Sequence, residues 1–228
     1  MPADQITPEK VRYFITFAKE GAMRFGGQLD LQRTFERTLR RAKLPLAYSH
    51  GFHPHPKINL GAALPLGIVS LCEIADIWLE QPIAPDKMIA ALQAASPEGL
   101  RFVEARQAPP KEPALQNLLA SAEYQIEWHQ EDQPEDLKKR VEQLLSQSSI
   151  LRERRGKSYD LLPLIEELQV NQRADGQEML LLKVCLQPGK TGRPDEVLRA
   201  MDLDPFLPDI TRIKFHYIEK TDVDKGSD

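Results

Sequence analysis

The chain has 228 residues, of which 41% are hydrophobic and 28% charged, and these fractions exclude a largely disordered protein. No apolar run approaches the roughly 18 residues that cross a bilayer, and residues 1–5 lack the pattern of a signal peptide. Two cysteines, Cys72 and Cys185, are too few for a cysteine-ligated iron–sulfur cluster or a four-cysteine zinc site. We therefore expect a cytoplasmic protein without membrane contact, disulfide or cofactor.

The net charge of −4 hides an uneven distribution along the chain. Residues 1–60 contain ten Lys/Arg and five Asp/Glu, which gives +5, whereas the remainder contains 20 and 29, which gives −9. A local excess of one sign attracts ligands of the opposite sign. Any anion-binding surface is therefore expected in the first segment.

The first 109 residues predict the element order β-α-β-β-α-β. The expected elements are a strand at 11–17, a helix from its N-cap Asp30 to Pro45, strands at 58–66 and 71–79, a helix at 85–95 and a strand at 100–105. This order is that of the ferredoxin-like motif, in which two helices cover one face of a four-stranded antiparallel sheet.

A proline-rich stretch at 109–113 marks a boundary, after which the order nearly repeats. We expect strands at 124–128, 150–154, 179–186 and 210–218, and helices at 135–145 and 194–200, with 161–172 as an insertion that fits the repeat poorly. The prediction is an α+β fold of two tandem ferredoxin-like halves with antiparallel sheets. The halves are residues 1–109 and 122–219, joined by a linker at 110–121 and followed by a disordered tail at 220–228.

Three of the five histidines lie between Ser49 and Lys57, in a segment that two prolines and a glycine shape into a loop. His53 and His55 project alike if this backbone is extended, and Glu73 and Asp76 on the following strand could supply carboxylates. Such imidazoles serve in metal ligation, proton transfer or phosphate contact, or they are hydrogen-bonding residues of a structural loop.

Two observations narrow the roles of this loop. The spacing of His50, His53 and His55 is not a usual zinc signature, so no metal is predicted. His55 lies between two prolines that fix the backbone, which makes it the best candidate for a general acid or base.

The helix before the loop carries a row of arginines. Arg33, Arg37 and Arg40 fall within about 60° of one another at 100° per residue, with Arg41 beside them. Arg24 and Lys57 bracket helix and loop, so a phosphate-rich ligand could lie across both. The alternative is an ordinary solvated helix face.

Two further segments suggest chemistry less strongly. The basic run 152–157 contains a glycine and is expected to be an exposed hairpin tip. The run 188–193 contains Gly-Lys-Thr, but Val184 stands where a P-loop needs its first glycine, so nucleotide binding is rejected. Pro194 and the two acids after it suit a helix start.

Many of these residues together resemble a known family. The resemblance rests on Arg24-Phe25, Leu29-Asp30, Arg37, Arg40-Arg41, 44–49, Gly51-Phe52, 54–56, 65–67, Ser70, Glu73, Asp76, 193–197 and Arg212. They are similar to the radical-SAM-linked family, domain of unknown function 2344. Gln28 stands where that family often has histidine and His53 where asparagine is common, which favours His55.

The resemblance implies that the chain acts with a separate radical SAM protein, because it lacks the three-cysteine motif itself. We expect an accessory module that binds RNA or another polyanion through Arg24, the helix arginines, Ser49, His53 and Lys57, with Asp30, Glu73 and Asp76 in supporting roles. The alternative is a metal-independent endoribonuclease with His55 as general acid or base, similar to the tandem ferredoxin-like enzymes of CRISPR-repeat processing.

Overall fold

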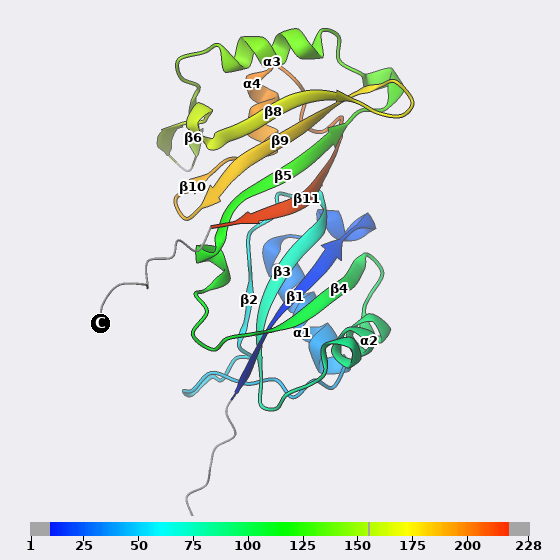
Figure 1. Cartoon of the computed structure of the whole chain (residues 1–228), viewed down its shortest axis with the longest axis vertical. Coiled ribbons are helices and arrows are strands. Elements are labelled where there is room, and N and C mark those ends of the chain that lie inside the picture. Colours follow the sequence, from blue (N-terminus) through cyan, green and yellow to red (C-terminus); the bar gives the residue numbers. More distant parts are fainter. Residues whose placement is uncertain (1–9, 155, 219–228) are drawn as a thin grey trace, which may run out of the picture.

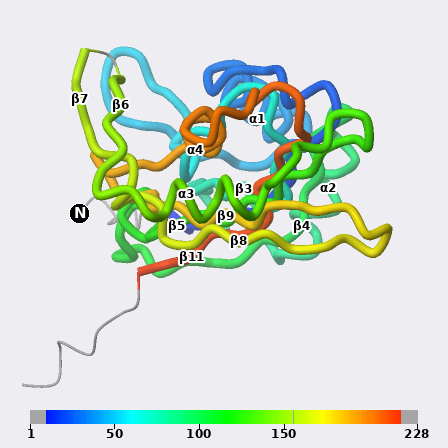
Figure 2. The backbone as a smooth tube through the Cα atoms, turned by 90° about the horizontal axis from the view of Figure 1, so that it is seen from above, coloured from blue at the N-terminus to red at the C-terminus, as the bar shows by residue number. Residues whose placement is uncertain are grey.

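The computed structural model describes residues 10–154 and 156–218 and has a mixed α+β fold. One large, mostly antiparallel sheet of nine strands runs through both halves of the chain, and the four helices α1 to α4 lie on one side of it (Figures 1 and 2). The elements of the first half are β1 (Val11–Lys19), α1 (Gln28–Arg41), β2 (Ile58–Leu60), β3 (Val69–Leu79), α2 (Pro85–Ala95) and β4 (Leu100–Ala108).

The first half has the strand order β4-β1-β3-β2. Alternate residues of β1 point to opposite faces, and Tyr13, Ile15 and Phe17 point to the face that α1 and α2 cover. There the ring centroids of Phe17 and Phe35 lie 5.0 Å apart, and Leu39 is fully buried in the same cluster. Burial of this apolar face fixes α1 against the sheet.

The second half contains β5 (Leu119–Glu127), α3 (Leu137–Leu145), β8 (Ile165–Gln172), β9 (Glu178–Gln187), α4 (Pro194–Ala200) and β11 (Asp209–Tyr217). Its strand order is β11-β5-β9-β8, and the short β10 (Lys190–Thr191) also pairs with β9. Tyr124 and Ile126 of β5 are buried in one cluster with α3 and α4. The alternate residues Glu123 and Glu127 are partly exposed on the open face, where charged side chains remain solvated.

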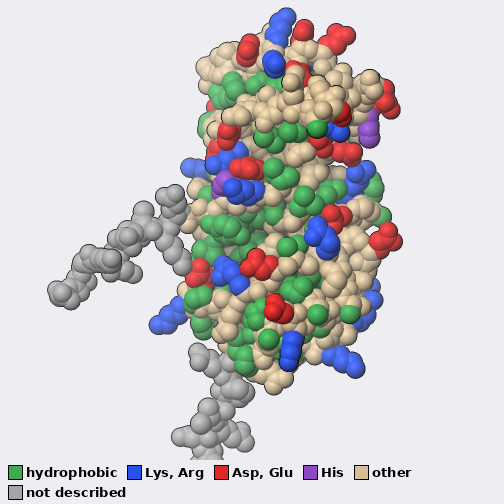
Figure 3. All heavy atoms as spheres, turned by 45° about the vertical axis from the view of Figure 1, so that its right-hand side comes forward, with side chains coloured by type: hydrophobic (Ala, Val, Ile, Leu, Met, Phe, Trp, Pro, Cys, Tyr) green, Lys and Arg blue, Asp and Glu red, His purple; other side chains and the backbone are tan. Residues whose placement is uncertain are grey.

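The two halves join along β11 and β3. These strands pair in parallel over two positions, Thr211 with Val69 and Arg212 with Ser70. The linker also packs on the first half: Leu115 is fully buried, and Arg12 donates hydrogen bonds to the carbonyls of Glu112 and Pro113. Figure 3 shows hydrophobic side chains gathered across the middle of one side of the molecule, between its upper and lower parts.

Two expectations for the first half are wrong in detail. Asp30 is not an N-cap: α1 begins at Gln28 after Gly27, and Asp30 lies in its first turn. The strand expected at 58–66 ends at Leu60, and the chain bends at residues 61 and 62. Glycine is required at this bend, since a β-carbon at position 61 would lie 2.6 Å from a methyl carbon of Ile74.

The largest correction concerns residues 161–172. This segment is not an insertion but supplies β8, which pairs with β9 along the sheet. The strand expected at 150–154 lies instead in a separate hairpin of β6 (Leu151–Arg154) and β7 (Lys157–Asp160). As an outer strand β8 buries one large side chain fully, Leu168, so its sequence lacks a strong apolar alternation.

The other elements were predicted to within a few residues, and α2 and α4 have the predicted bounds. The division into domains at 1–109 and 122–219 stays a prediction, and the tail at 220–228 lies outside the described residues. No helix in the described part of the chain is long and apolar enough to cross a membrane.

Candidate anion-binding cleft

A cleft of about 1140 Å³ separates the two halves on the side of the sheet that carries the helices. The first half contributes the start of α1, the 3₁₀ turn before it (Gly21–Phe25) and the loop 63–68. The second half contributes the β6–β7 hairpin, the start of α4 and the loop 205–210. The cleft therefore brings together segments that are distant in the sequence.

Positive charge predominates in this cleft. Among the described residues, six cationic side chains line it: Arg24, Arg154, Lys157, Arg193, Arg199 and Arg212. The lining includes two carboxylates, Asp195 and Asp209, and two more, Glu73 and Glu196, pair with lining arginines from behind. The six cations therefore outnumber the four carboxylates, and the cleft has a net positive charge. A cleft with a net positive charge concentrates anionic ligands.

The start of α4 forms one wall. Pro194 occupies the first helical turn, where its missing N–H costs nothing, and Asp195 follows it. The Asp195 carboxylate accepts hydrogen bonds from Arg193 at 2.9 Å and from Arg199 at 2.8 Å. Two guanidinium groups therefore share one carboxylate and leave an excess of positive charge at this wall.

The β6–β7 hairpin forms a second part of the same wall. Gly156 has a φ of +73°, which permits the tight turn expected there. Arg154 and Tyr159 both bond to Glu196 of α4, which fixes the hairpin against the helix. Burial, together with the hydrogen bond to Glu196, raises the pKa of Tyr159 to about 12, so this hydroxyl stays protonated at neutral pH.

The floor of the cleft is a buried ionic network at the junction of the halves. Arg212 of β11 donates a hydrogen bond to Glu73 of β3 at 2.7 Å, and two more go to the hydroxyl of Tyr124 at 2.8 and 3.0 Å. Burial alone would lower the pKa of Arg212, but Tyr124 and Glu73 raise it, so the guanidinium stays charged.

Lys19 lies beside this network and is only 1% exposed. Its ammonium donates to the carbonyl of Gly26 at 2.8 Å, just before the start of α1. Burial lowers the pKa of Lys19, and the neighbouring Glu73 carboxylate counters this effect in part. Two buried cations, one in the floor and one beside it, thus lie near one buried carboxylate.

Apolar side chains are exposed between these charges. Phe25, Leu66 and Phe206 line the cleft and are 65%, 65% and 84% exposed. The guanidinium of Arg24 lies 4.9 Å from the centre of the Phe25 ring and also pairs with Asp209 at 3.0 Å. Exposed aromatic rings beside cations are suited to stacking against planar groups of an anionic ligand.

The histidine loop lies at the opposite end of the first half. β1 starts beside Leu79 and ends beside the turn that carries Arg24, whereas the loop precedes Ile58, which pairs with Ile77. A strand of nine residues is about 30 Å long. Of the predicted site residues, Arg24 alone lines the cleft. The helix arginines are exposed along α1, which leads away from the cleft: Arg33, Arg37, Arg40 and Arg41. The remaining predicted residues lie past the end of that helix, in the histidine loop: Ser49, His53, His55 and Lys57.

The loop is a small hairpin held by backbone contacts. Tyr48 bridges to Pro56, Ser49 donates its N–H to the His55 carbonyl at 2.8 Å, and the Ser49 hydroxyl accepts the His55 N–H at 3.0 Å. In the described part of the chain, no side-chain partner lies within hydrogen-bond distance of the His53 or His55 imidazole. The endoribonuclease hypothesis stays a prediction.

The carboxylates expected to support the loop are engaged elsewhere. Asp76 forms a buried two-point ion pair with Arg12 at 2.6 and 3.0 Å, and Glu73 pairs with Arg212 in the cleft floor. Among the described residues, no group of three His, Cys, Asp or Glu side chains is arranged to hold a metal ion.

The family model described as "Uncharacterized protein conserved in bacteria (DUF2344)" matches residues 12–194, more than half of the chain. The chain belongs to this family. Some of the residues on which its resemblance to the DUF2344 family rests meet in space: Arg24-Phe25, residues 65–67, Arg193, Asp195 and Arg212 line the cleft, and Glu73 lies in its floor. Other residues of the pattern, namely 44–49, 51–52 and 54–56, lie in or just before the histidine loop, so the family pattern covers both the cleft and the loop.

Comparison with solved structures adds no functional argument. A chain described as "Crystal structure of putative glycine cleavage system transcriptional repressor" aligns over 92% of this chain and 98% of its own length, with 11% identity and a TM-score of 0.25. No match was found among proteins with curated descriptions.

Sequence reasoning missed five of the six cations of the cleft. Arg154 and Lys157 were assigned to an exposed turn, and Arg193 and Arg212 were quoted in the resemblance without a role. Charge counting pointed to residues 1–60 because the second half is acidic in total. Many acidic residues of the second half, such as Glu123 and Glu166, lie outside the cleft lining. A net charge summed over the segment does not show that its cations and its carboxylates lie on different surfaces.

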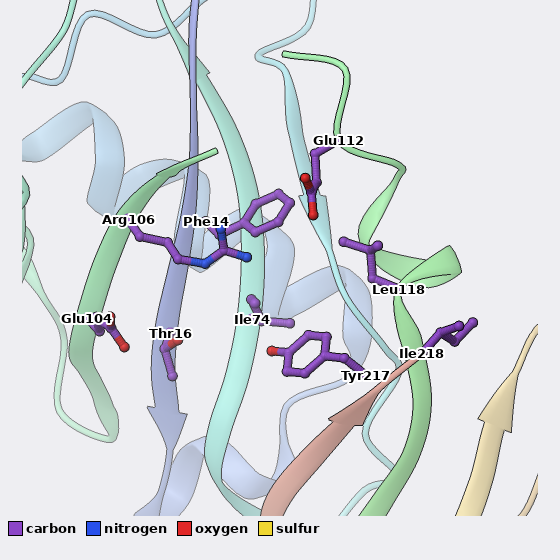
Figure 4. Close-up of a pocket in the computed structure, with 9 residues that line it drawn as sticks. All are labelled: Phe14, Thr16, Ile74, Glu104, Arg106, Glu112, Leu118, Tyr217 and Ile218. Carbon is purple, nitrogen blue, oxygen red and sulfur yellow. The ribbon is translucent and has the colours of Figure 1, made fainter. Parts of the chain in front are cut away.

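A smaller hollow of about 250 Å³ lies between β1, β4 and β11 (Figure 4). Its lining includes one cation, Arg106, whose guanidinium lies 4.6 Å from the centre of the Phe14 ring. Two carboxylates, Glu104 and Glu112, also line it. This hollow therefore lacks the net positive charge of the cleft, and the cleft is the better candidate for binding an anionic ligand.

Proposed function

We propose that this protein is an accessory binding module for RNA and that the cleft between its halves is the binding site. The observation that carries the proposal is the gathering of six cationic side chains around a cleft large enough for several nucleotides. The buried Arg212 and Lys19 in and beside the floor add positive potential where the surrounding protein screens it least.

The apolar part of the lining favours RNA over a small inorganic anion. Phe25 presents an exposed ring beside Arg24, and Phe206 presents another in the same lining. Bases of a single strand stack on such rings with little sequence preference. Phosphate contacts by arginine and lysine then supply most of the affinity.

A binding assay with a fluorescent single-stranded oligouridine tests the proposal. We expect binding at about 50 mM salt, with an affinity that falls steeply as salt rises. The cleft variant Lys157→Gln/Arg199→Gln should weaken binding by about tenfold or more and reduce the salt slope by about 1 to 2, because each lost phosphate contact removes about one unit.

Lys139→Gln provides the control, since Lys139 is an exposed cation on α3 outside the cleft lining. It should leave the affinity within about twofold. No binding at low salt, salt-insensitive binding, or an equal loss in the control would each overturn the proposal.

We further propose, from the family resemblance, that the module acts with a separate radical SAM protein. Purification of the tagged chain from its native cells, followed by mass spectrometry, should recover such a protein. Repeated recovery without it would contradict this part of the proposal.

We also propose that each half is ferredoxin-like. The strand orders β4-β1-β3-β2 and β11-β5-β9-β8 support this assignment, since in each half a helix follows the first and the third strand in chain order. Tandem modules of this kind leave a cleft between them for an extended ligand.

A further inference from the structure

Helix α1 connects the cleft with the histidine loop. Gly27 and Gln28, at its start, line the cleft, and the helix ends at Arg41. Its 14 residues span about 21 Å. Tyr48, the first residue of the loop hairpin, lies beneath the guanidinium of Arg40 at 5.9 Å.

The outer face of α1 is a continuous row of cations, here called the ridge: Arg33, Arg37, Arg40 and Arg41. All four are exposed, and they lie on the side of the helix opposite its buried residues Leu31, Phe35 and Leu39. Arg40 pairs with Glu36 at 2.8 Å, whereas no ion pair to the other three is present within the described residues.

The loop continues this positive surface. Lys57 lies 5.4 Å from the centre of the Trp78 ring, and Phe52 at the loop tip is fully exposed. The three exposed imidazoles of His50, His53 and His55 can donate hydrogen bonds to phosphate. Cations and exposed rings therefore recur along one path from the cleft to the far end of the first half.

We propose that the ligand of the cleft is an extended single strand of RNA that leaves it along the ridge and reaches the loop at Tyr48 to Lys57. The inference rests on the proposed function. A compact anion could occupy the cleft alone, but only a polymer could also neutralise the ridge cations, which follow the helix for about 12 Å from residue 33 to residue 41. At a stacked spacing of about 3.4 Å per nucleotide, a strand that follows the whole of α1 places about six nucleotides on the helix, of which about three or four cover the ridge.

Two RNA lengths separate the cleft from the ridge. An oligouridine of about 4 nucleotides fits within the cleft, whereas one of about 16 also covers the ridge. We expect the ridge variant Arg33→Gln/Arg37→Gln/Arg41→Gln to bind the long probe about tenfold or more weakly, with a salt slope lower by about 2 to 3. Its affinity for the short probe should be unchanged. The cleft variant should weaken both probes.

Asp30→Asn gives a change in the opposite direction. Asp30 is an exposed carboxylate in the first turn of α1, at the entrance to the ridge. Its loss should increase the affinity for the long probe by a few-fold and change the affinity for the short probe less. The control Lys87→Gln/Lys139→Gln removes exposed cations from α2 and α3 and should change neither.

The possible outcomes distinguish the two proposals. If the ridge variant binds both the short and the long probe as tightly as the wild type does, the path along α1 is overturned and the proposed function of the cleft is retained. Failure of both probes to bind the wild-type protein would overturn the cleft function itself. Circular dichroism of each variant shows whether α1 remains folded, since the substituted side chains are exposed.

Discussion

Arg212 joins the two halves through its ion pair with Glu73, and both side chains are almost fully buried. Removing one partner of such a pair leaves the other charge in the protein interior without compensation. We expect Arg212→Met to lower the free energy of unfolding by about 3 to 5 kcal/mol, measured by urea denaturation.

The double variant Arg212→Met/Glu73→Gln should recover much of this loss, because no buried charge then remains unpaired. Arg199→Met, which removes a half-exposed partner of Asp195, serves as control and should cost less than about 1 kcal/mol. A double variant no more stable than Arg212→Met would contradict the expected coupling.

Cys72 gives the protein a specific dependence on alkaline pH. Burial, with the nearby Glu73 carboxylate, raises the thiol pKa from 9.0 to about 12. Above pH 9 the unfolded chain therefore releases the thiol proton while the folded chain keeps it, so stability falls as the pH rises from 9 towards 12. Urea midpoints should drop less between pH 8 and pH 10 in Cys72→Ala than in the wild type or in Cys185→Ala.

At the scale of elements, the sequence was most informative where helices have well-defined starts and stops. Pro85 and Pro194 open α2 and α4, and each helix has the predicted bounds. The strands were harder to predict, because pairing partners and not local pattern decide whether a segment joins the sheet. For this reason, residues 161–172, which were predicted to be an insertion, supply a strand of the large sheet. Residues 151–154, which were predicted to be a strand of that sheet, lie in a separate hairpin.

The strand β8 supplies a test of this correction. Leu168 packs into the core of the second half from β8. Leu168→Ala should destabilise the protein by about 2 to 3 kcal/mol in urea denaturation, as expected for a buried leucine. The exposed Gln172 on the same strand is the control, and its replacement by alanine should cost less than about 0.5 kcal/mol. Equal effects would contradict the placement of β8.

For the candidate site, local patterns revealed residues but not their grouping. The histidine loop stood out because three histidines lie close together in the sequence, whereas the cleft brings Arg24 together with Arg193 and Arg212, which follow it by well over a hundred residues. Such a site depends on the tertiary arrangement, which neither spacing nor charge sums along the chain can encode.

At the scale of the whole molecule, the shared sheet should make the halves unfold together. The two tryptophans report on different halves, since Trp78 lies on β3 and Trp128 follows β5. Fluorescence of the single-tryptophan variants Trp78→Phe and Trp128→Phe should give coincident urea midpoints after correction for the small effect of each substitution. Two separated transitions would show that the halves unfold independently.

The central position of β11 has a consequence for biosynthesis. This strand lies between β5 and β3, yet the ribosome makes it after every other strand of the sheet. Until residues 209–217 emerge, the nascent chain presents an unpaired edge along β5 and at the start of β3, where other chains could pair. The cleft, whose floor includes Arg212, therefore cannot be complete before β11 has been synthesised.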